Sequence, residues 1–541
     1  MASRMLRRRL VLLGLGVLTV VSSACIHVFV KTEVAAVQRP TSTRSDSIRS
    51  PIKAHLADGS TVMFPNGAVV SATGITGYGQ HYPLLSDAPT YRPSVPMDSV
   101  VAVESFNGRF FPVQSVVVSA AATAITAAFV ATAAVALFGS CPTVYVDSGA
   151  GPLLQAEGFS YALSPLMEHR DLDPLRVSPD ANGVIRLELR NEAMETHFIN
   201  HIELVTARHA VGTRLVPDQH GHPVTVGGFA RLDAARDRAG RDVHSALATA
   251  DGQLYSTAPA VLAGAREGDL DDWIDLYISD LPAGDSLVVM LRLRNSLLNT
   301  ILLYEGMLGG RDAADWLSTD LNNISRTVDL SRWYTATMGM RLTVDGVALS
   351  ADAPYRGHAR LSDVGPIAFR DVAVVLPRPA TTSANSKGRA QVRLAFVADN
   401  WRIDEVRVAG THARPETQLI RLASVIVPTP AEGEGPVRDT AAVPRLAEAD
   451  EQYLETRPGQ RMALLFEAVT STPAPEGQTD TYLIAWQGWY SEWLRPQWLA
   501  NPSRTEPFVA GDGAMMTALA RWKTRQASFE RDFYASSIPV R

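Results

Sequence analysis

Imidazole and carboxylate groups lie close together in one short part of the sequence. Glu195, His197 and His201 precede or enter a segment, 199–207, whose composition predicts a β-strand. Side chains at alternate positions of a strand share one face, so these three would point the same way. They form a donor set that can bind zinc. One strand alone leaves such a site open, however, and neutral histidine is common in half-buried strands, so both interpretations stand at this point.

Carboxylates also gather in the segment GDLDDWID, which contains Asp269, Asp271, Asp272 and Asp275. Oxygen ligands of this kind suit calcium, but the spacing differs from the D-x-[DN]-x-[DN]-G calcium loop. The alternative is a solvated turn that precedes a strand near 276–278. The spacing favours the turn.

The third group is aromatic. Trp486, Trp489, Tyr490 and Trp493 lie in the segment IAWQGWYSEW. Residues four apart share a helix face, so a short helix would present two aromatic faces. Exposed tryptophan and tyrosine rings bind ligands or partner proteins, whereas buried rings fill a core. The four residues are therefore the predicted platform for a ligand or partner, with core packing as the alternative.

No segment matches a common catalytic or phosphate-binding motif. The string nearest to G-x-S-x-G is Gly158-Phe-Ser160-Tyr-Ala162, which ends in alanine and lacks a strand–turn–helix context. The sequence also lacks a P-loop, a G-x-G-x-x-G fingerprint and an H-E-x-x-H zinc motif. Cys25 and Cys141 adjoin apolar segments, which suits anchoring or burial better than a reactive thiolate. We expect no catalytic residues and no cofactor.

The N-terminus has the features of an export signal. Arg4 and three further arginines at 7–9 precede an uncharged run over 10–24, and Cys25 follows. A basic region, a short apolar region and small residues at its end are what the secretion machinery recognises. Because Cys25 stands at the cleavage point, residues 1–24 resemble a bacterial lipoprotein signal, in which this cysteine carries the lipid.

One position departs from the lipoprotein pattern, since Ser22 stands where that pattern prefers leucine. The alternatives are an uncleaved anchor over 10–30, which is long enough to cross about 30 Å of hydrocarbon, and ordinary cleavage. A lipid or an anchor would each tie the protein to a membrane.

A second apolar segment, 113–138, contains no charged residue. It is long enough to cross a bilayer as a helix, and its alanines would let that helix approach a neighbour closely. It is also rich in Ala, Ser and Thr, which contribute little transfer free energy, so a buried alanine-rich helix is the alternative. If a spanning helix follows an exported N-terminus, residues 141–541 return to the cytoplasm. The sequence leaves the side of these residues open.

Around these segments the chain is predicted to be mainly β. Residues 31–52 are polar and contain prolines, which predicts a tether over 25–54. Turn pairs and short apolar runs then predict a small β-module over 55–112. Residues 141–427 alternate short strands with turns, as β-sandwich-like domains with a few helices do. Residues 448–541 are predicted to form a C-terminal β-region that ends in a helix over about 514–533.

Composition excludes several classes of protein. Lys+Arg total 50 against Asp+Glu 56, which gives a formal net charge of −6, and no basic block is present. A nucleic-acid groove needs clustered cations, so we expect no nucleic-acid partner. Hydrophobic residues make up 46% of the chain, which is too many for a mostly disordered protein. The 2 cysteines exclude a small disulfide-rich scaffold.

Several short strings, read in order, resemble a known group of proteins. They are Ser140-Cys141-Pro142-Thr143-Val144-Tyr145, Glu157-Gly158-Phe159-Ser160-Tyr161, Asn400-Trp401-Arg402-Ile403-Asp404 and Gln487-Gly488-Trp489. Together they are similar to a poorly characterised group of bacterial envelope, lipoprotein-like proteins with an SCP-x-x-Y motif after a hydrophobic helix. The resemblance covers about 141–500 and implies an exported or membrane-tethered β-rich domain. It implies no catalytic residue.

These observations predict a non-enzymatic, membrane-tethered protein of the cell envelope, facing the periplasm or the cell surface, that binds a protein, glycan or surface component. Two alternatives stay open. One is an assembly or structural subunit of a membrane complex, built around 113–138. The other is an envelope hydrolase, which would need convergent polar groups in a pocket.

Overall fold

The computed structural model describes most of the chain. The predicted signal (1–24), Cys25 and the apolar segment 113–138 lie outside the described residues. Among the residues that are described, we find no helix with the length and apolarity that a membrane crossing requires. The described residues are 30–37, 45–83, 90–110, 141–279, 286–303, 323–344, 359–377, 390–428, 436–450, 452–467, 474–495 and 511–540, together with Ala313, Leu317 and Leu321.

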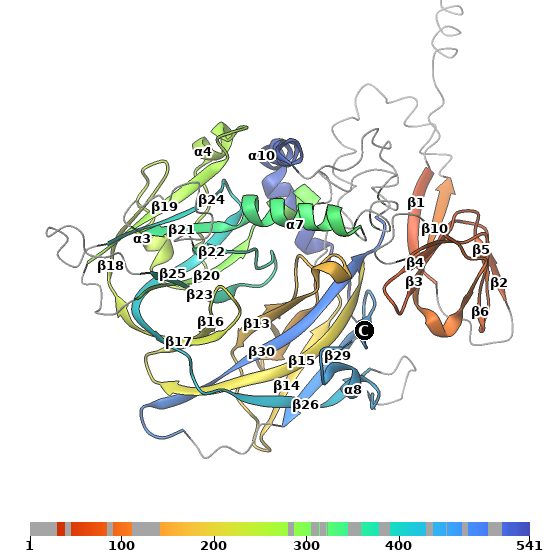
Figure 1. Ribbon diagram of the computed structural model, residues 1–541, viewed down its shortest axis with the longest axis horizontal. Coiled ribbons are helices and arrows are strands. Elements are labelled where there is room, and N and C mark those ends of the chain that lie inside the picture. Colours follow the sequence, from red (N-terminus) through yellow and green to blue (C-terminus); the bar gives the residue numbers. More distant parts are fainter. Residues whose placement is uncertain are drawn as a thin grey trace, which may run out of the picture.

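The prediction of a mainly β protein is confirmed. Within the described residues the strands form five sheets, arranged in three bodies (Figure 1). An N-terminal module lies at one end of the molecule and a two-sheet sandwich at the other, with one large curled sheet between them.

The N-terminal module (residues 30–110) consists of two packed sheets. Their facing sides bury apolar side chains, among them Ile52, Val62, Phe64 and Ile75. One sheet has the order β1 (Val30–Ala36), β10 (Val100–Phe110), β3 (Ile52–Leu56), β4 (Thr61–Phe64), β7 (Gln80–Tyr82) and β8 (Thr90–Tyr91), and the other has β2 (Asp46–Ile48), β5 (Ala68–Val70), β6 (Gly74–Gly77) and β9 (Ser94–Pro96).

The tether predicted over 25–54 is wrong for two of its segments. β1 pairs antiparallel with β10, and β2 pairs with β5, so both belong to the module. Each is the edge strand of its sheet. An edge strand needs backbone pairing on one side only and tolerates polar side chains, which explains why a polar composition did not reveal these strands.

The large sheet brings together two distant parts of the chain, 143–210 and 418–492. Its strands run in the order β12 (Pro152–Glu157), β11 (Thr143–Asp147), β14 (Val184–Arg190), β29 (Arg461–Glu467), β26 (Gln418–Val427), β15 (Glu195–Ala210), β30 (Gln478–Glu492) and β13 (His169–Leu175), with β27 (Val437–Arg438) beside β26 and β28 (Leu454–Thr456) beside β15.

Two features of this sheet correct the predicted domain boundaries. β29 lies between β14 and β26, and β30 lies between β15 and β13, so 141–427 and 448–541 do not form separate bodies. The sheet also curls until its end strands, β12 and β13, meet. The Arg176 amide, directly after β13, donates to Gln155 Oε1 on β12 at 2.7 Å. The main hydrophobic core lies within the curl and includes Leu187, Phe198 and Phe466.

The third body is a sandwich of two sheets, at the end of the molecule opposite the N-terminal module. The inner sheet has the order β16 (Arg214–Pro217), β17 (Pro223–Ala230), β25 (Trp401–Ala413), β20 (Ser286–Asn295) and β23 (Arg370–Pro377). The outer sheet has the order β18 (Leu232–Asp237), β19 (Asp271–Ile278), β24 (Ala390–Val397), β21 (Met340–Val344) and β22 (Ala359–Leu361).

Strand β20 shows how the bodies stack. Its residues Leu287, Val289 and Leu291 pack between the inner and outer sheets, whereas Val288 and Met290 are buried on the opposite face of the inner sheet. Contacts of β16 and β23 with β13 bring the inner sheet against the large sheet. A strand that is buried on both faces reads as a continuous apolar run, which is the pattern of LVVMLRL in the sequence.

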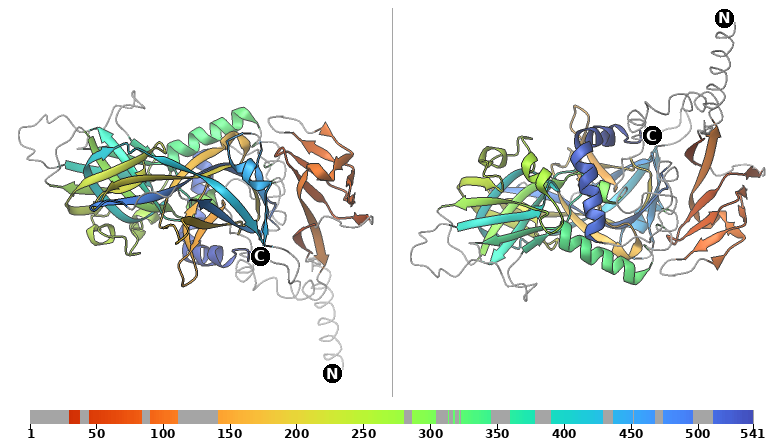
Figure 2. Two further views of the ribbon diagram at one scale, coloured as in Figure 1. Left: turned by 90° about the horizontal axis from the view of Figure 1, so that it is seen from below. Right: turned by 90° about the horizontal axis from the view of Figure 1, so that it is seen from above.

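The helices are short except for two. α7 (Ile324–Met338) contacts β24 and the 3-10 helix η2 (Pro165–Met167), and α10 (Asp512–Ala535) contacts α5 (Leu298–Ile301). Both long helices lie over the middle of the molecule (Figure 2). α10 confirms the predicted terminal helix. The remaining described helices are η1 (Met97–Ser99), α3 (His244–Leu247), α4 (Pro259–Gly264) and α8 (Ala442–Leu446).

The N-terminal module docks on the end of β30 through buried groups. The His55 ring stacks on the Trp493 ring with centroids 5.5 Å apart. The Leu494 amide donates to Glu104 Oε2 at 3.2 Å. His55, Glu104 and Trp493 are each at most 1% exposed. The module and the large sheet therefore form a continuous, solvent-excluded interface.

Candidate functional site

The predicted zinc residues do not form a metal site. On β15, His197 Nε2 lies 2.9 Å from Glu195 Oε1, and its Nδ1 lies 3.0 Å from Thr456 Oγ1. The pairing register shifts between Ile199 and His201, which breaks the alternation that would have kept the three side chains on one face. His201 instead lies beside Glu203 at 3.8 Å. Across the described residues no group of three or more His, Cys, Asp or Glu side chains could hold a metal ion.

The predicted aromatic platform is part of the core. Trp486, Trp489 and Tyr490 lie on β30 and Trp493 follows it, so the helical spacing was the wrong interpretation. All four are at most 3% exposed. Three of the four donate hydrogen bonds inside the protein: Trp486 Nε1 to Asp173, Tyr490 Oη to the Ser160 carbonyl and Trp493 Nε1 to Thr196.

The acidic segment around β19 is explained by internal pairs. Each of its four carboxylates has a partner from another segment, and these partners leave no shared space for calcium. The pairs are Asp269 with Arg238 at 2.9 Å, Asp271 with Arg341 at 2.5 Å, Asp272 with Tyr255 at 2.6 Å and Asp275 with Arg393 at 2.7 Å.

A small pocket lies where the large sheet, α5, α7 and the turn 363–368 meet; we call it the central pocket. Its volume is about 150 Å³. Apolar surface predominates in its walls, and hydroxyl groups are the main polar component. The lining residues are Ser160, Tyr161, Leu163, Met167, Asn299, Thr300, Leu303, Leu330, Ser331, Tyr334, Thr335, Pro366 and Tyr490.

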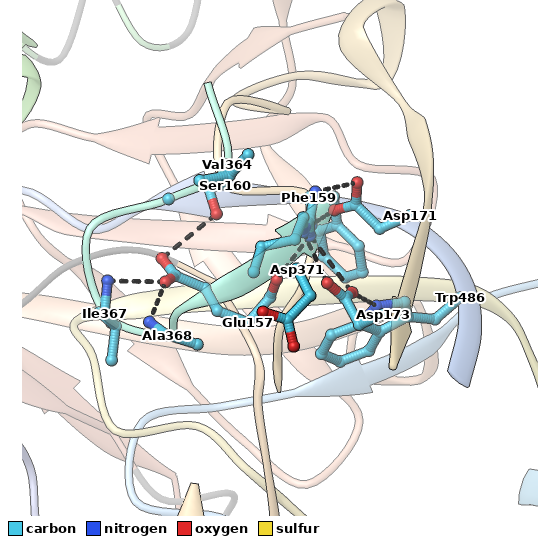
Figure 3. A network of polar contacts seen from close by, with 12 residues as sticks. Glu157, Phe159, Ser160, Asp171, Asp173, Val364, Ile367, Ala368, Asp371 and Trp486 are labelled. Carbon is cyan, nitrogen blue, oxygen red and sulfur yellow. Dashed lines mark hydrogen bonds and ion pairs between the residues drawn. The ribbon is translucent and has the colours of Figure 1, made fainter. Parts of the chain in front are cut away.

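Glu157 lies next to Ser160, which lines the central pocket, and Figure 3 shows the contacts of its carboxyl group. Ser160 Oγ donates to its Oε1 at 3.2 Å, and the amides of Ile367 and Ala368 donate to its Oε2 at 2.7 and 2.8 Å. Burial raises the pKa of Glu157 to about 7, against the opposing effect of these donors and of Arg370. One carboxyl group at the end of β12 thus holds both the Ser160 segment and the turn 363–368 in place.

The turn 363–368 approaches Ser160 so closely that only glycine fits at its centre. Gly365 has a φ of +101°, a conformation that side chains rarely adopt. A Cβ atom there would lie 2.5 Å from Glu157 Cδ and closer still to Ser160 Oγ. The amides of Val364 and Gly365 are both taken by Asn295 Oδ1, at 2.8 and 3.1 Å.

Asp363 lies behind a second wall of the pocket. It accepts hydrogen bonds from the Tyr334 hydroxyl on α7 and from Asn295 Nδ2, the latter at 2.9 Å. Burial raises the pKa of Asp363 to about 6, although these donors act in the opposite direction. Because Tyr334 lines the pocket, its hydroxyl connects the pocket to this buried carboxylate.

A guanidinium group completes the network. Arg370 on β23 donates to Asp173 Oδ1 at 2.6 Å, to Asp171 Oδ1 at 2.9 Å and to the Glu157 carbonyl at 3.2 Å. Burial alone would raise the pKa of Asp171, but Arg370 holds it well below its usual range. At Asp173 burial outweighs Arg370 and, with the neighbouring charge of Asp171, raises the pKa to about 6. The Phe159 amide also donates to Asp171, at 2.6 Å.

This arrangement is suited to binding. The described lining residues supply hydroxyl, amide and apolar groups, and the carboxylates act on the pocket through Ser160 and Tyr334. A serine nucleophile needs an adjacent base that can take its proton. The carboxyl group beside Ser160 also accepts from two backbone amides, which fix its position.

Sequence reasoning did not find this pocket. Ser160 lies in the string that was compared with G-x-S-x-G, but that comparison gave no reason to connect it with Tyr334 or Asp363. No local spacing links residues from β12, α7 and the turn 363–368. The sequence pointed to this region only through the string EGFSY, which contains Glu157, Ser160 and Tyr161.

Comparisons with known proteins do not identify a family. No family model matches the chain, and no curated protein matches it. Among solved structures, a GH31 alpha-xylosidase from Xanthomonas citri is 9% identical with a TM-score of 0.15, covering 84% of this chain and 38% of that one. The secreted serine protease VesC from Vibrio cholerae is 7% identical with a TM-score of 0.12, covering 71% and 99%.

This chain therefore spans well under half of the xylosidase. Both scores are too low for either similarity to carry an argument about fold or function.

Proposed function

We propose that this chain is a non-enzymatic binding protein of the cell envelope, and that the central pocket holds a small organic group, free or carried by an envelope component. The observation that carries the proposal is the composition of the pocket. Mostly apolar walls surround a cavity of about 150 Å³, and several hydroxyl groups converge on it. Small-molecule sites have this composition, in which polar groups orient an apolar ligand. A cavity of about this volume accommodates a molecule the size of benzene.

The envelope location rests on the N-terminal sequence. Basic residues, an apolar run and Cys25 favour export and attachment to a membrane. The contacts of His55 with Trp493 and of Glu104 with Leu494 add a constraint, because groups that touch must lie in one compartment. An exported N-terminal module would therefore have the large sheet, and the central pocket, on the same side of the membrane as itself.

A panel of small aromatic probes tests the binding proposal. Benzyl alcohol, benzylamine and benzoate are titrated separately into the full chain by calorimetry, and we expect at least one to bind. The variant Leu303→Trp, which fills the pocket from a half-buried lining position, abolishes that binding. Leu232→Trp, at a half-buried position of the outer sheet, is the matched control and keeps it. Absence of binding by all three probes, or binding that survives Leu303→Trp, overturns the proposal.

The proposal that the protein is not an enzyme is checked by mass spectrometry of the bound probe, which we expect to be recovered unchanged.

The location is checked by protease treatment of intact spheroplasts in which the protein carries a C-terminal tag. Cleavage of the tag in intact cells, and release of the protein from membranes by Cys25→Ser, support a tethered protein that faces outward. A tag that is protected until lysis contradicts it.

A further inference from the structure

The hydroxyl groups of the central pocket have directions that are set by the protein itself. A hydroxyl carries one proton and can donate it once. Ser160 donates to Glu157 at 3.2 Å, Tyr334 donates to Asp363, and Tyr490 donates to the Ser160 carbonyl at 3.0 Å. All three protons are thus used inside the wall. With their protons used, these three hydroxyl oxygens can offer a ligand only acceptor capacity, which Tyr334 already shares with Asn299.

The internal acceptors keep the hydroxyls in this orientation. Glu157 and Asp363 are buried. Glu157 accepts from Ser160 on one oxygen and from two backbone amides on the other, and Asp363 accepts from the side chains of Asn295 and Tyr334, one on each oxygen. A Ser160 or Tyr334 hydroxyl that turned its proton toward a ligand would leave one carboxylate oxygen without its donor. Such a loss is costly in a buried place, so a ligand group that contacts the Ser160 or Tyr334 hydroxyl has to supply the donor.

The charges behind the pocket wall point to the same class of ligand. Two buried carboxyls hydrogen-bond lining residues, those of Glu157 and Asp363, and two more, those of Asp171 and Asp173, belong to the same network through Arg370. The guanidinium groups nearby are Arg370, which pairs with the two aspartates at 171 and 173, and Arg294, which donates to the Pro366 carbonyl at 2.9 Å. The wall therefore has more negative than positive groups, in a medium where charges act strongly over short distances.

The aromatic lining is compatible with a positive charge. Tyr161, Tyr334 and Tyr490 all line the pocket. The face of a tyrosine ring attracts an ammonium group through the ring quadrupole. None of the described lining residues is a lysine or an arginine, so no lining cation would repel such a group or neutralise an anionic ligand.

From the hydroxyl orientations, the buried carboxylates and the ring faces we infer that the ligand of the central pocket is a small organic ammonium ion, namely a protonated amine on an apolar body of about benzene size. The inference rests on the proposed function, since it names the ligand class of that same pocket. Ammonium N–H groups donate to Ser160 and Tyr334, and the apolar body lies against Leu163, Leu303 and Leu330.

Calorimetry with three probes of nearly equal size tests the charge requirement. At about pH 8 benzylamine is mostly protonated, benzyl alcohol is neutral and benzoate is negative. We expect benzylamine to bind at least tenfold more tightly than benzyl alcohol, and benzoate not to bind. Equal binding of benzylamine and benzyl alcohol, or tighter binding of benzoate, overturns the ammonium inference while leaving a binding pocket. Failure of all three probes overturns the pocket itself.

Two variants tie the preference to the named groups. Tyr334→Phe removes the acceptor and Asp363→Asn removes the charge behind it, so each should lower the benzylamine to benzyl alcohol affinity ratio several-fold. Tyr255→Phe is the matched control, because its hydroxyl donates to Asp272 at 2.6 Å in another part of the fold and lines no part of the pocket. Should Tyr334→Phe not fold, Ser160→Ala provides the same test. A ratio that is unchanged in these pocket variants contradicts the inference.

Discussion

Arg370 Nε on the inner sheet donates to Asp173 Oδ1 on the large sheet at 2.6 Å. The guanidinium also reaches Asp171 at 2.9 Å, and all three side chains are largely excluded from solvent. This pair joins β23 to β13, strands of different bodies that are far apart in the sequence. It lies next to the central pocket, so the junction of the two bodies and the candidate binding site share one polar network.

Replacing Arg370 by methionine should destabilise the fold strongly. The substitution keeps most of the side-chain length but leaves two buried carboxylates without a counter-charge, which costs about 3–5 kcal/mol. Urea unfolding of the full chain measures this change. Arg332→Met is the control, because Arg332 and Asp329 form an exposed pair at 3.4 Å and such pairs contribute at most about 1 kcal/mol. Similar losses in both variants would contradict the role given to Arg370.

The tryptophan at 489 should behave as a core residue. Its ring stacks on Phe198 with centroids 4.1 Å apart and is 3% exposed. Trp489→Ala is expected to lower the free energy of unfolding by about 3–5 kcal/mol, as for other large aromatic residues in cores. Tyr91→Ala, at a position that is 63% exposed, should change it little. A nearly unchanged Trp489→Ala stability would restore the platform that the sequence suggested.

Gly365 should tolerate no side chain. Gly365→Ala combines a φ of +101° with overlap against Glu157 and Ser160. Gly212 has a similar φ of +90° but open space around it, so Gly212→Ala reports the backbone strain alone, about 1–2 kcal/mol. The Gly365 variant should lose at least about 1 kcal/mol more in urea unfolding, because it also overpacks a buried site. Equal losses would mean that the turn 363–368 moves away easily.

Stability should fall with rising pH because of Glu195. Burial raises the pKa of Glu195 to about 8, opposed by Arg495, whereas the ordinary pKa of a glutamate is 4.5. The folded state thus holds a proton that the unfolded chain releases, and this contribution to stability is complete below about pH 4.5 and is lost as the pH rises through 8. Melting temperatures from pH 5 to 9 should therefore decline, and Glu195→Gln should flatten the decline.

His197 acts in the opposite sense and in a separate range. Burial lowers its pKa to about 3, against the attraction of Glu492, so its contribution is complete above about pH 6.5 and is lost as the pH falls toward 3. Measuring above pH 6.5 removes the contribution of His197, whereas Glu157, whose pKa is raised to about 7, still adds to the decline. The contribution of Glu195 is therefore the difference in slope between the parent protein and Glu195→Gln. Glu476→Gln, at an exposed position, is the control and should leave the decline as in the parent protein. A decline as steep in Glu195→Gln as in the parent protein would assign it to other groups.

The sequence by itself determined the structural class and much of the secondary structure. Apolar alternation identified strands such as β24, and the LVVMLRL run identified β20. The terminal helix was also predicted, as α10. These features depend on the period of side chains along the backbone and on local turn chemistry, which a linear pattern records directly.

Only the tertiary structure decided what the chemically interesting residues do. The aromatic segment 486–493 fits a helix by spacing, but β30 is pinned between β15 and β13, which buries its rings. The register shift in β15 separates His201 from Glu195 and His197. The central pocket exists because β12, α7 and the turn 363–368 meet at one point. Burial and convergence arise from contacts between distant segments, and a pattern of neighbouring residues carries no information about them.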